Sequence, residues 1–504
     1  MNKQHSSFDK ACEHATQIRY LESTMALLEW DQHTKLPSQG GEYRARQITF
    51  LAGEIHRRKT DAKYGDLLNE LAESDLAKDK HSDSGATIAE LRRDFQKKSK
   101  LPQSLVENLA RECSLGQQVW IEARKADDFS KFAPNLKTIF ELKREQADAI
   151  GFEDQAYDAL LDEYEPGAKT AAVAKALNEL KDELVPLVAK IADSGKKPDI
   201  EILHRNFPVA AQERFCKMAS NKIGFDYQRG RLDVTHHPFC TELGPDDVRI
   251  TTRYDESFFN SAFFGTLHEA GHGIYEQGLR TAYYGLAPGQ YCSLGIHESQ
   301  SRLWENLVGR CNAFWNHFYA DAQSEFPQAL GDVPQEQFYA AINDVRPSLI
   351  RVEADELTYN LHIIIRFQLE QDLINGVLNT DDLPSAWNAK YEEFLGIHPP
   401  SNADGVLQDV HWSAGLIGYF PTYSLGNLYA SQFYEAAENE LGDLPAMFAR
   451  GEFQPLKDWL NKNVHARGKC FLSTELGELV TGKPLSHHPL MKHLREKTSE
   501  IYGL

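Results

Sequence analysis

The pentapeptide His268-Glu269-Ala270-Gly271-His272 is the most informative stretch of this sequence. Residues four apart lie on one face of an α-helix, so the two imidazoles can bind a single cation. The glutamate between them can reach a water on that cation rather than the cation itself. The simpler interpretation is a pair of ordinary helical histidines beside a solvated glutamate, and a helical context favours the metal site over it.

The residues around the pentapeptide supply that context. A helix over residues 258–277 is predicted by four apolar side chains at three- and four-residue spacing, Phe263, Phe264, Leu267 and Tyr275. Asp255 is expected to cap the first turn of this helix, and Gly278 is expected to end it.

A hydrolytic zinc site needs a third protein ligand and one open position for water. No H-x-x-G-x-x-H continuation follows His272, which excludes the version with three histidines. The carboxylates to consider are Glu276, Glu298 and Glu305. Glu276 lies a further turn along the same helix, where direct binding would be strained, so it suits an outer position. Glu298, beyond a glycine-rich loop, is the favoured ligand, and Glu305 is the fallback.

The rest of the chain predicts a mainly α fold. Amphipathic spacing predicts helices that include residues 61–71, 86–97, 171–192, 297–310 and 334–367. β-Branched and aromatic residues predict two short strands, 231–239 and 248–254, paired antiparallel beside the zinc helix. Because no linker-like tract divides the chain, we expect one large unit, 1–504. Within it, residues 1–229 are expected to be helical, residues 230–430 to carry the catalytic site, and residues 431–504 to be helical again.

The composition of the 504 residues is that of an acidic globular protein. Lys and Arg number 54 against 74 Asp and Glu, and the net charge of −20 argues against nucleic acid or an anionic membrane as a partner. The seven cysteines are scattered without a C-x-x-C pair, as expected for reduced thiols. Neither a signal peptide nor a membrane span is recognisable, so we expect a cytoplasmic protein.

Beyond the pentapeptide, the chain resembles the carboxypeptidase Taq family of zinc metallocarboxypeptidases. Five further family motifs lie in order between residues 237 and 412. They are His237-Pro238-Phe239, Asp247-Val248-Arg249-Ile250-Thr251, His297-Glu298-Ser299-Gln300, Ile350-Arg351-Val352-Glu353-Ala354-Asp355 and Gly405-Val406-Leu407-Gln408-Asp409-Val410-His411-Trp412. The resemblance implies an almost all-helical, groove-containing fold, a homodimer, and a zinc ion held by His268, His272 and Glu298.

Zinc chemistry gives roles to further residues. Zinc lowers the pKa of a bound water and polarises the scissile carbonyl. Glu269 is then the expected general base. A neutral or cationic donor should also face the oxyanion, and similar helical zinc peptidases use a His and a Tyr there. His411 and Tyr423 are the best candidates, with Tyr419 third and grouped with the substrate-binding residues. Each of the three can equally be a packed aromatic or a satisfied core histidine.

Cleavage at a C-terminus requires recognition of a free carboxylate, which arginine binds best through a planar two-point contact. Arg351 is the favoured residue for this role, and Arg249 is the second candidate. A structural pair with Asp247, two residues away on a strand, is the more expected role of Arg249. His237 of the first family motif completes the predicted substrate-binding residues.

The sequence thus predicts a zinc-dependent metallocarboxypeptidase that acts with broad specificity on peptides with a free C-terminal carboxylate. Co²⁺ or Mn²⁺ can occupy the same kind of site in place of Zn²⁺. A zinc oligopeptidase or dipeptidyl carboxypeptidase with the same chemistry is the nearest alternative. A non-catalytic peptide-binding or zinc-storage protein is a further one.

Overall fold

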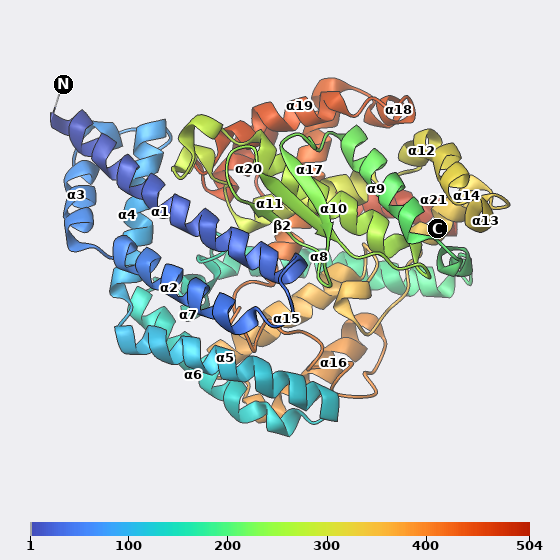
Figure 1. The fold of residues 1–504 in the computed structure, drawn as a ribbon. Coiled ribbons are helices and arrows are strands. Elements are labelled where there is room, and N and C mark those ends of the chain that lie inside the picture. The colour runs from blue at the N-terminus through green and yellow to red at the C-terminus, as the bar shows by residue number, and fades with distance from the viewer. Residues whose placement is uncertain (1–2) are drawn as a thin grey trace. The chain divides into compact units, whose positions relative to one another are not determined.

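The computed structural model describes residues 3–504 (Figure 1). These residues form two compact units. The first unit is made of residues 3–99, 198–342 and 430–484, and the second of residues 100–197, 343–429 and 485–504. Each unit is therefore assembled from three separate stretches of the chain. The single unit expected from the sequence, with boundaries at 229 and 430, stays a prediction.

The first unit contains most of the helices and the strands. Its helices are α1 (Lys3–Thr34), α2 (Gly41–Lys59), α3 (Ala62–Ala72), α4 (Asp83–Lys100), α9 (Val209–Ile223), α10 (Phe259–Gly278), α11 (Leu294–Arg302), α12 (Asn312–Glu325), α13 (Pro327–Leu330), α14 (Gln335–Ile342), α18 (Leu444–Ala449), α19 (Gln454–Asn463) and α20 (Ser473–Thr481). The second unit is helical: α5 (Gln103–Ala126), α6 (Ala133–Ile150), α7 (Ala156–Leu161), α8 (Thr170–Asp193), α15 (Tyr359–Ile374), α16 (Leu383–Leu395) and α21 (His488–Tyr502). Residues of α17 (Pro421–Leu441) belong to both units. The prediction of a mainly α fold is confirmed.

A small three-stranded sheet packs on α10 in the first unit. β1 (Gly230–Val234) pairs with β3 (Val248–Thr252) in parallel, whereas β2 (Cys240–Glu242) pairs with the other edge of β3 antiparallel. The predicted sheet beside the zinc helix is confirmed, but the antiparallel pairing of the two predicted strands is wrong. The connection between β1 and β3 is long enough to contain β2. Because β2 pairs antiparallel with one edge of β3, β1 pairs with the opposite edge, and it does so in parallel.

Several predicted helices are confirmed. Segments 61–71, 86–97 and 171–192 lie in α3, α4 and α8, and Asp61 caps α3 by accepting a hydrogen bond from the Tyr64 amide (3.0 Å). The zinc helix is α10, and it ends at Gly278 as predicted. The predicted cap is wrong, because Asp255 accepts hydrogen bonds from the amide (2.8 Å) and hydroxyl (2.7 Å) of Ser257 before the helix begins.

Two predicted helices are interrupted in the structure. The helix over 297–310 changes after Arg302 into a π-helical turn, Leu303–Val308. The helix over 334–367 is divided between α14 and α15, and the stretch between them contains Pro347. Proline lacks the amide that would continue a helix, which accounts for the second break.

An aromatic core anchors the first half of α10. Phe259 and Phe263 of α10 contact rings from α9, α12 and α14: Phe263 lies 5.0 Å from Phe215 and 5.2 Å from Trp315, and Phe259 lies 5.4 Å from Phe338 (centroid distances). All five side chains are buried. Aromatic rings bury large apolar areas, so this core fixes the helix that carries the histidines in its second half.

The second unit is built around α15. Nearly every residue of this helix is buried, and it packs on α6, α7, α8 and α16. A helix that is buried on all sides lies at the centre of its unit, and the polar side chains of α15 that are buried there, such as Arg366 and Glu370, are hydrogen-bonded. None of the seven cysteines forms a disulfide, and the described residues include no helix long and apolar enough to cross a membrane.

Candidate metal centre and active site

Three side chains of the first unit converge on one point. The Nε2 atoms of His268 and His272 on α10 lie 3.6 Å and 3.4 Å from Oε2 of Glu298 on α11. One ligand atom from each of the three residues lies within 4.8 Å of the others. With ligand bonds near 2.0–2.2 Å, such a spacing suits three donors around a common ion.

Gly271 allows the two helices to approach this closely. A Cβ at this position would lie 2.6 Å from the carbonyl oxygen of Gln300 and 2.6 Å from Cα of Ser301, both backbone atoms of α11. The glycine between the two histidines therefore brings α11 against α10, and Glu298 lies one turn from this contact.

The second nitrogen of each imidazole is already bonded. Nδ1 of His268 lies 2.9 Å from Oε2 of Glu305, on the π-helical turn, and Nδ1 of His272 lies 3.1 Å from the carbonyl oxygen of His297. Hydrogen bonds of this kind fix the orientation and tautomer of metal-binding histidines. With Nδ1 bonded, Nε2 is the nitrogen of each ring that faces Glu298 and is placed to bind an ion.

The two carboxylates that were weighed against Glu298 lie in outer positions. Glu305, the fallback ligand, bonds to the far side of the His268 ring. Glu276, expected in an outer position, lies 2.8 Å from Nε2 of His297 through its Oε1 atom. Neither carboxylate belongs to the three-residue group.

Arg302 determines which oxygen of Glu298 faces the histidines. Its Nε atom donates to Oε1 of Glu298 at 2.7 Å, which leaves Oε2 for the imidazoles. Burial alone would raise the pKa of Glu298, but Arg302 and the two histidines hold this pKa well below its usual range. The carboxylate is therefore ionised, as a metal ligand must be.

Burial acts differently on the neighbouring groups of α10. It lowers the pKa of His272 to about 3, with a further contribution from His297. It also lowers the pKa of His268, but the facing carboxylates of Glu298 and Glu305 outweigh it and raise this pKa to about 8. The buried Glu269 has a pKa raised to about 7, chiefly by burial.

These residues fit a divalent transition metal. Two imidazole nitrogens and one carboxylate oxygen are a donor set typical of catalytic zinc, with the remaining position open to water. Imidazole ligands disfavour Mg²⁺ and Ca²⁺, which prefer oxygen.

The predicted carboxylate receptor, Arg351, lies in the second unit and is 5% exposed. Its Nε (3.1 Å) and Nη2 (2.8 Å) atoms both donate to Oδ1 of Asp409, and its Nη1 atom donates to the Tyr359 hydroxyl (3.0 Å). Arg366 donates to the other oxygen of Asp409 at 2.6 Å. Two guanidinium groups thus share one carboxylate, so the group carries one excess positive charge.

The predicted oxyanion donors lie beside Arg351 in the same unit. Nε2 of His411 lies 3.4 Å from the Tyr423 hydroxyl, and the Tyr419 ring lies 5.6 Å from the His411 ring and 5.3 Å from the Tyr423 ring. Burial lowers the pKa of His411 to about 4. The imidazole is therefore neutral near pH 7, with one N–H to donate.

The other two predicted substrate-binding residues lie on the sheet side of the first unit. Arg249 on β3 makes the pair expected for it, with Nε 2.8 Å and Nη2 2.9 Å from the two carboxylate oxygens of Asp247. Its guanidinium also lies 4.3 Å from the centroid of the Trp30 ring. His237 is exposed, in the connection between β1 and β2.

Two residues of these groups were missed in the sequence. Arg302 lies four residues after Glu298, and that spacing on one helix would have been sufficient to find it. Arg366 is 43 residues from Asp409 in the chain, and no local pattern connects the two.

Comparison with known proteins identifies the family. The family model described as "Carboxypeptidase Taq (M32) metallopeptidase" matches residues 10–498. The chain is 47% identical to thermostable carboxypeptidase 1 of Thermus thermophilus, over 99% of both chains. It is 39% identical to carboxypeptidase 1 of Bacillus subtilis, over 97% of both chains.

Solved structures support the same family assignment. The crystal structure of the M32 carboxypeptidase from Deinococcus radiodurans superposes with a TM-score of 0.96 at 42% identity, covering 99% of this chain and 100% of that one. Metallocarboxypeptidase 1 of Trypanosoma cruzi gives a TM-score of 0.91 at 31% identity, covering 98% and 99%. This chain therefore belongs to the carboxypeptidase Taq (M32) family of metallopeptidases and is a metallocarboxypeptidase, a hydrolase that acts on peptides with a divalent metal.

Proposed function

We propose that the metal is zinc and that the enzyme removes residues one at a time, with broad specificity, from peptides that end in a free carboxylate. The observation that carries this proposal is the convergence of His268, His272 and Glu298 next to Glu269 on α10. Co²⁺ and Mn²⁺ are alternative occupants of the same donors.

When bound, the ion supplies Lewis-acid chemistry that activates water and polarises the scissile carbonyl. Glu269 takes the proton of the attacking water and passes it to the departing amine. It is the carboxylate nearest in sequence to both histidines, and burial keeps it from being a solvated surface group. Arg302 and Glu305 hold the ligands in place around it.

Stabilisation of the oxyanion is assigned to a neutral histidine and a tyrosine. His411, neutral near pH 7, and Tyr423 are the proposed donors, since each offers one hydrogen to a developing negative charge. Tyr419 packs against both rings and is proposed to contact substrate.

Recognition of the substrate's carboxylate is assigned to Arg351. The excess positive charge of Arg351, Arg366 and Asp409 supports this role, because a buried cationic group favours an anionic partner. Arg249 and His237 are proposed as secondary contacts, although Arg249 already has Asp247 as its partner.

Assembly and location are also proposals. We infer a homodimer from the family resemblance. We also infer a cytoplasmic setting, which the seven cysteine thiols outside any disulfide support. Nucleic acid and membranes are not expected as partners, because the net charge is −20. Light scattering coupled to size-exclusion chromatography tests the dimer.

Product analysis tests the activity. Zinc-loaded protein is incubated with peptides that differ only in a free or amidated C-terminus, and the products are identified by mass spectrometry. We expect stepwise loss of single residues from the free peptides and little hydrolysis of the amides. Equal cleavage of both would indicate an oligopeptidase, and release of dipeptides would indicate a dipeptidyl carboxypeptidase.

Glu269→Gln separates catalysis from metal binding. We expect turnover to fall by roughly 10²- to 10⁴-fold while the zinc content stays the same, because the lost group accepts a proton and binds no metal. Undiminished turnover would remove Glu269 from the proposed mechanism, and loss of zinc would make it a ligand.

A further inference from the structure

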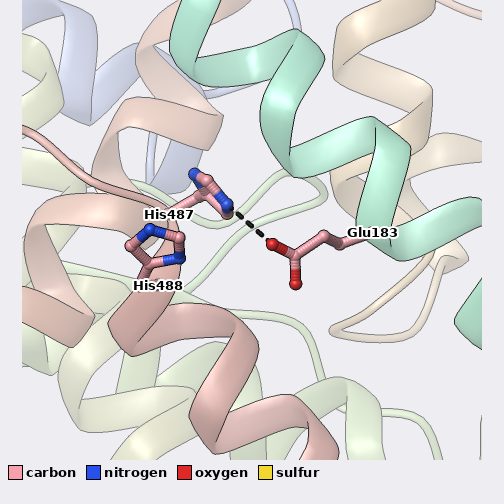
Figure 2. Close-up of side chains that lie close together, drawn as sticks. All are labelled: Glu183, His487 and His488. Atoms are coloured by element: carbon pink, nitrogen blue, oxygen red, sulfur yellow. Dashed lines mark hydrogen bonds and ion pairs between the residues drawn. The ribbon is translucent and has the colours of Figure 1, made fainter.

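A second group of two histidines and one glutamate lies in the second unit, at the start of the C-terminal helix. His487 and His488 lie where α21 begins, and Glu183 faces them from α8 (Figure 2). One ligand atom from each of the three lies within 4.8 Å of the others, the same limit that the residues of the first site meet. No family motif quoted above includes these residues.

Each ring nitrogen of His487 faces a carboxylate. Its Nε2 atom lies 2.9 Å from Oε1 of Glu183, and its Nδ1 atom faces Oε2 of Glu179, one helical turn earlier on α8, at 3.7 Å. An imidazole that faces a ligand oxygen on one side and an orienting carboxylate on the other is typical of metal-binding histidines. His268 likewise lies between two carboxylates, with Nε2 3.6 Å from Glu298 and Nδ1 2.9 Å from Glu305.

Glu183 also resembles Glu298 in how it is held. Arg495, two turns along α21, donates to Oε2 of Glu183 at 2.5 Å, and this leaves Oε1 directed toward the histidines. In the first site Arg302 binds one oxygen of Glu298 and leaves the other to the imidazoles. In both groups, therefore, an arginine selects a single carboxylate oxygen for the shared point.

The burial of the three side chains leaves a route for an ion. His487 is 5% exposed, so one wall of the group is fixed in the protein, whereas His488 is exposed and Glu183 is partly exposed. The rings of His487 and His488 lie 4.3 Å apart. An exposed imidazole can rotate to complete the coordination, at a cost in side-chain entropy that lowers the affinity.

We propose that Glu183, His487 and His488 form a second site for a divalent transition metal of the zinc class, weaker than the site at His268, His272 and Glu298. Imidazole nitrogens select Zn²⁺, Co²⁺ or Ni²⁺ over Ca²⁺ and Mg²⁺. Because its donors come from α8 and from the start of α21, the ion would cross-link these two helices within the second unit.

Zinc stoichiometry tests the proposal. Equilibrium dialysis of the full chain against excess Zn²⁺, followed by elemental analysis, should give two ions per chain for the wild type and one for His488→Gln. His56→Gln, which changes an exposed histidine on α2, is the matched control and should retain two. Hydrolysis of peptides by His488→Gln should equal that of the wild type, because His488 takes no part in the proposed reaction.

Two further variants keep the outcome unambiguous. In a His272→Gln background, which lacks the first site, one ion per chain should remain bound. Adding His488→Gln should remove this ion, so the second site is tested independently of the first. Glu179→Gln keeps all three ligands and should weaken the second site by about tenfold, since it removes the group that orients His487. A wild type that binds a single ion, or a His488→Gln variant that still binds two, would overturn the proposal.

Discussion

Arginine side chains fix the orientation of two functional carboxylates, those of Glu298 and Asp409. Arg302 occupies one oxygen of Glu298, and Arg351 and Arg366 occupy both oxygens of Asp409. A guanidinium has a rigid fork of donors, so it fixes a carboxylate in one orientation better than the flexible ammonium of lysine. Replacement of any of these arginines changes geometry as well as charge.

Arg351→Ala tests the proposed carboxylate receptor. We expect kcat/KM for free peptides to fall by roughly 10- to 100-fold, because a charge-assisted hydrogen bond is lost, while the already slow hydrolysis of amidated peptides changes little. Asp409 keeps Arg366 as its partner, so the fold is expected to persist. Arg111→Ala, which removes an exposed arginine of the same unit, is the control, and a melting curve checks both variants. Unchanged discrimination between free and amidated peptides would exclude Arg351 from this role.

Glu370 gives a prediction for stability against pH. This fully buried carboxyl group of α15 accepts hydrogen bonds from the Tyr157 hydroxyl (2.5 Å), the Trp412 indole (2.8 Å) and the Gly418 amide (3.0 Å). Burial nevertheless raises its pKa from 4.5 to about 7. The folded state therefore holds the proton more tightly than the unfolded state does. The resulting stabilisation is fully present below pH 4.5 and is lost as the pH rises through about 7.

Glu370→Gln should remove that pH dependence, which amounts to about 3 kcal/mol. Urea unfolding at pH 5 and pH 8 measures it, with Glu153→Gln, at an exposed carboxyl of the same unit, as control. Were the wild type and Glu370→Gln to lose stability equally between these pH values, the carboxyl group would already be ionised throughout the range.

At the scale of elements, the contact between α10 and α11 controls the metal centre. Gly271→Ala places a Cβ 2.6 Å from backbone atoms of α11, which cannot rotate away as a side chain could. We expect α11 to shift, zinc affinity to fall by at least about tenfold, and stability to decrease by about 1–3 kcal/mol.

Gly265→Ala is a matched control on the same helix. A Cβ there meets only the Thr252 hydroxyl, at 3.9 Å. It should leave zinc affinity unchanged and raise stability slightly, since alanine favours a helix over glycine by about 1 kcal/mol. Calorimetric zinc titration compares the two variants, and equal affinities would show that the close approach of α11 does not set the site.

The elements differ in how far the sequence predicts them. Amphipathic helices such as α3 and α8 are readable because their apolar spacing is local. The parallel pairing of β1 with β3 is not, since it depends on β2 taking the other edge. The π-helical turn that presents Glu305 to His268 has no recognisable sequence signal, so only the structure distinguishes this outer partner from a ligand.

The site shows the same division between local and distant information. The spacing on a single helix predicts His268, Glu269 and His272. A sequence motif on the following helix predicts Glu298. The link from Asp409 to Arg351 and Arg366 joins residues 58 and 43 positions apart, and only the packed fold brings them together. No local sequence pattern indicates the group of Glu183, His487 and His488, because Glu183 lies 304 residues before His487 in the chain.

For the molecule as a whole, we expect metal to be required for activity but not for folding. The proposed metal ligands lie on α10 and α11, and α10 is anchored by an aromatic core of side chains that include no proposed ligand. Treatment with a chelator should abolish hydrolysis and lower Tm, while the helical circular dichroism signal persists at 25 °C. Added Zn²⁺ should restore both activity and Tm. Unfolding on chelation would instead make the ion structural.

Because each unit is assembled from three separate stretches of the chain, the order of synthesis affects folding. The first unit needs residues 430–484, so α1–α4 leave the ribosome hundreds of residues before their last partners exist. At about 5–20 residues per second, the nascent chain waits tens of seconds with unfinished apolar surfaces. Chaperones that shield such surfaces during translation should therefore matter more for the yield of this protein than for one whose units each come from a continuous stretch.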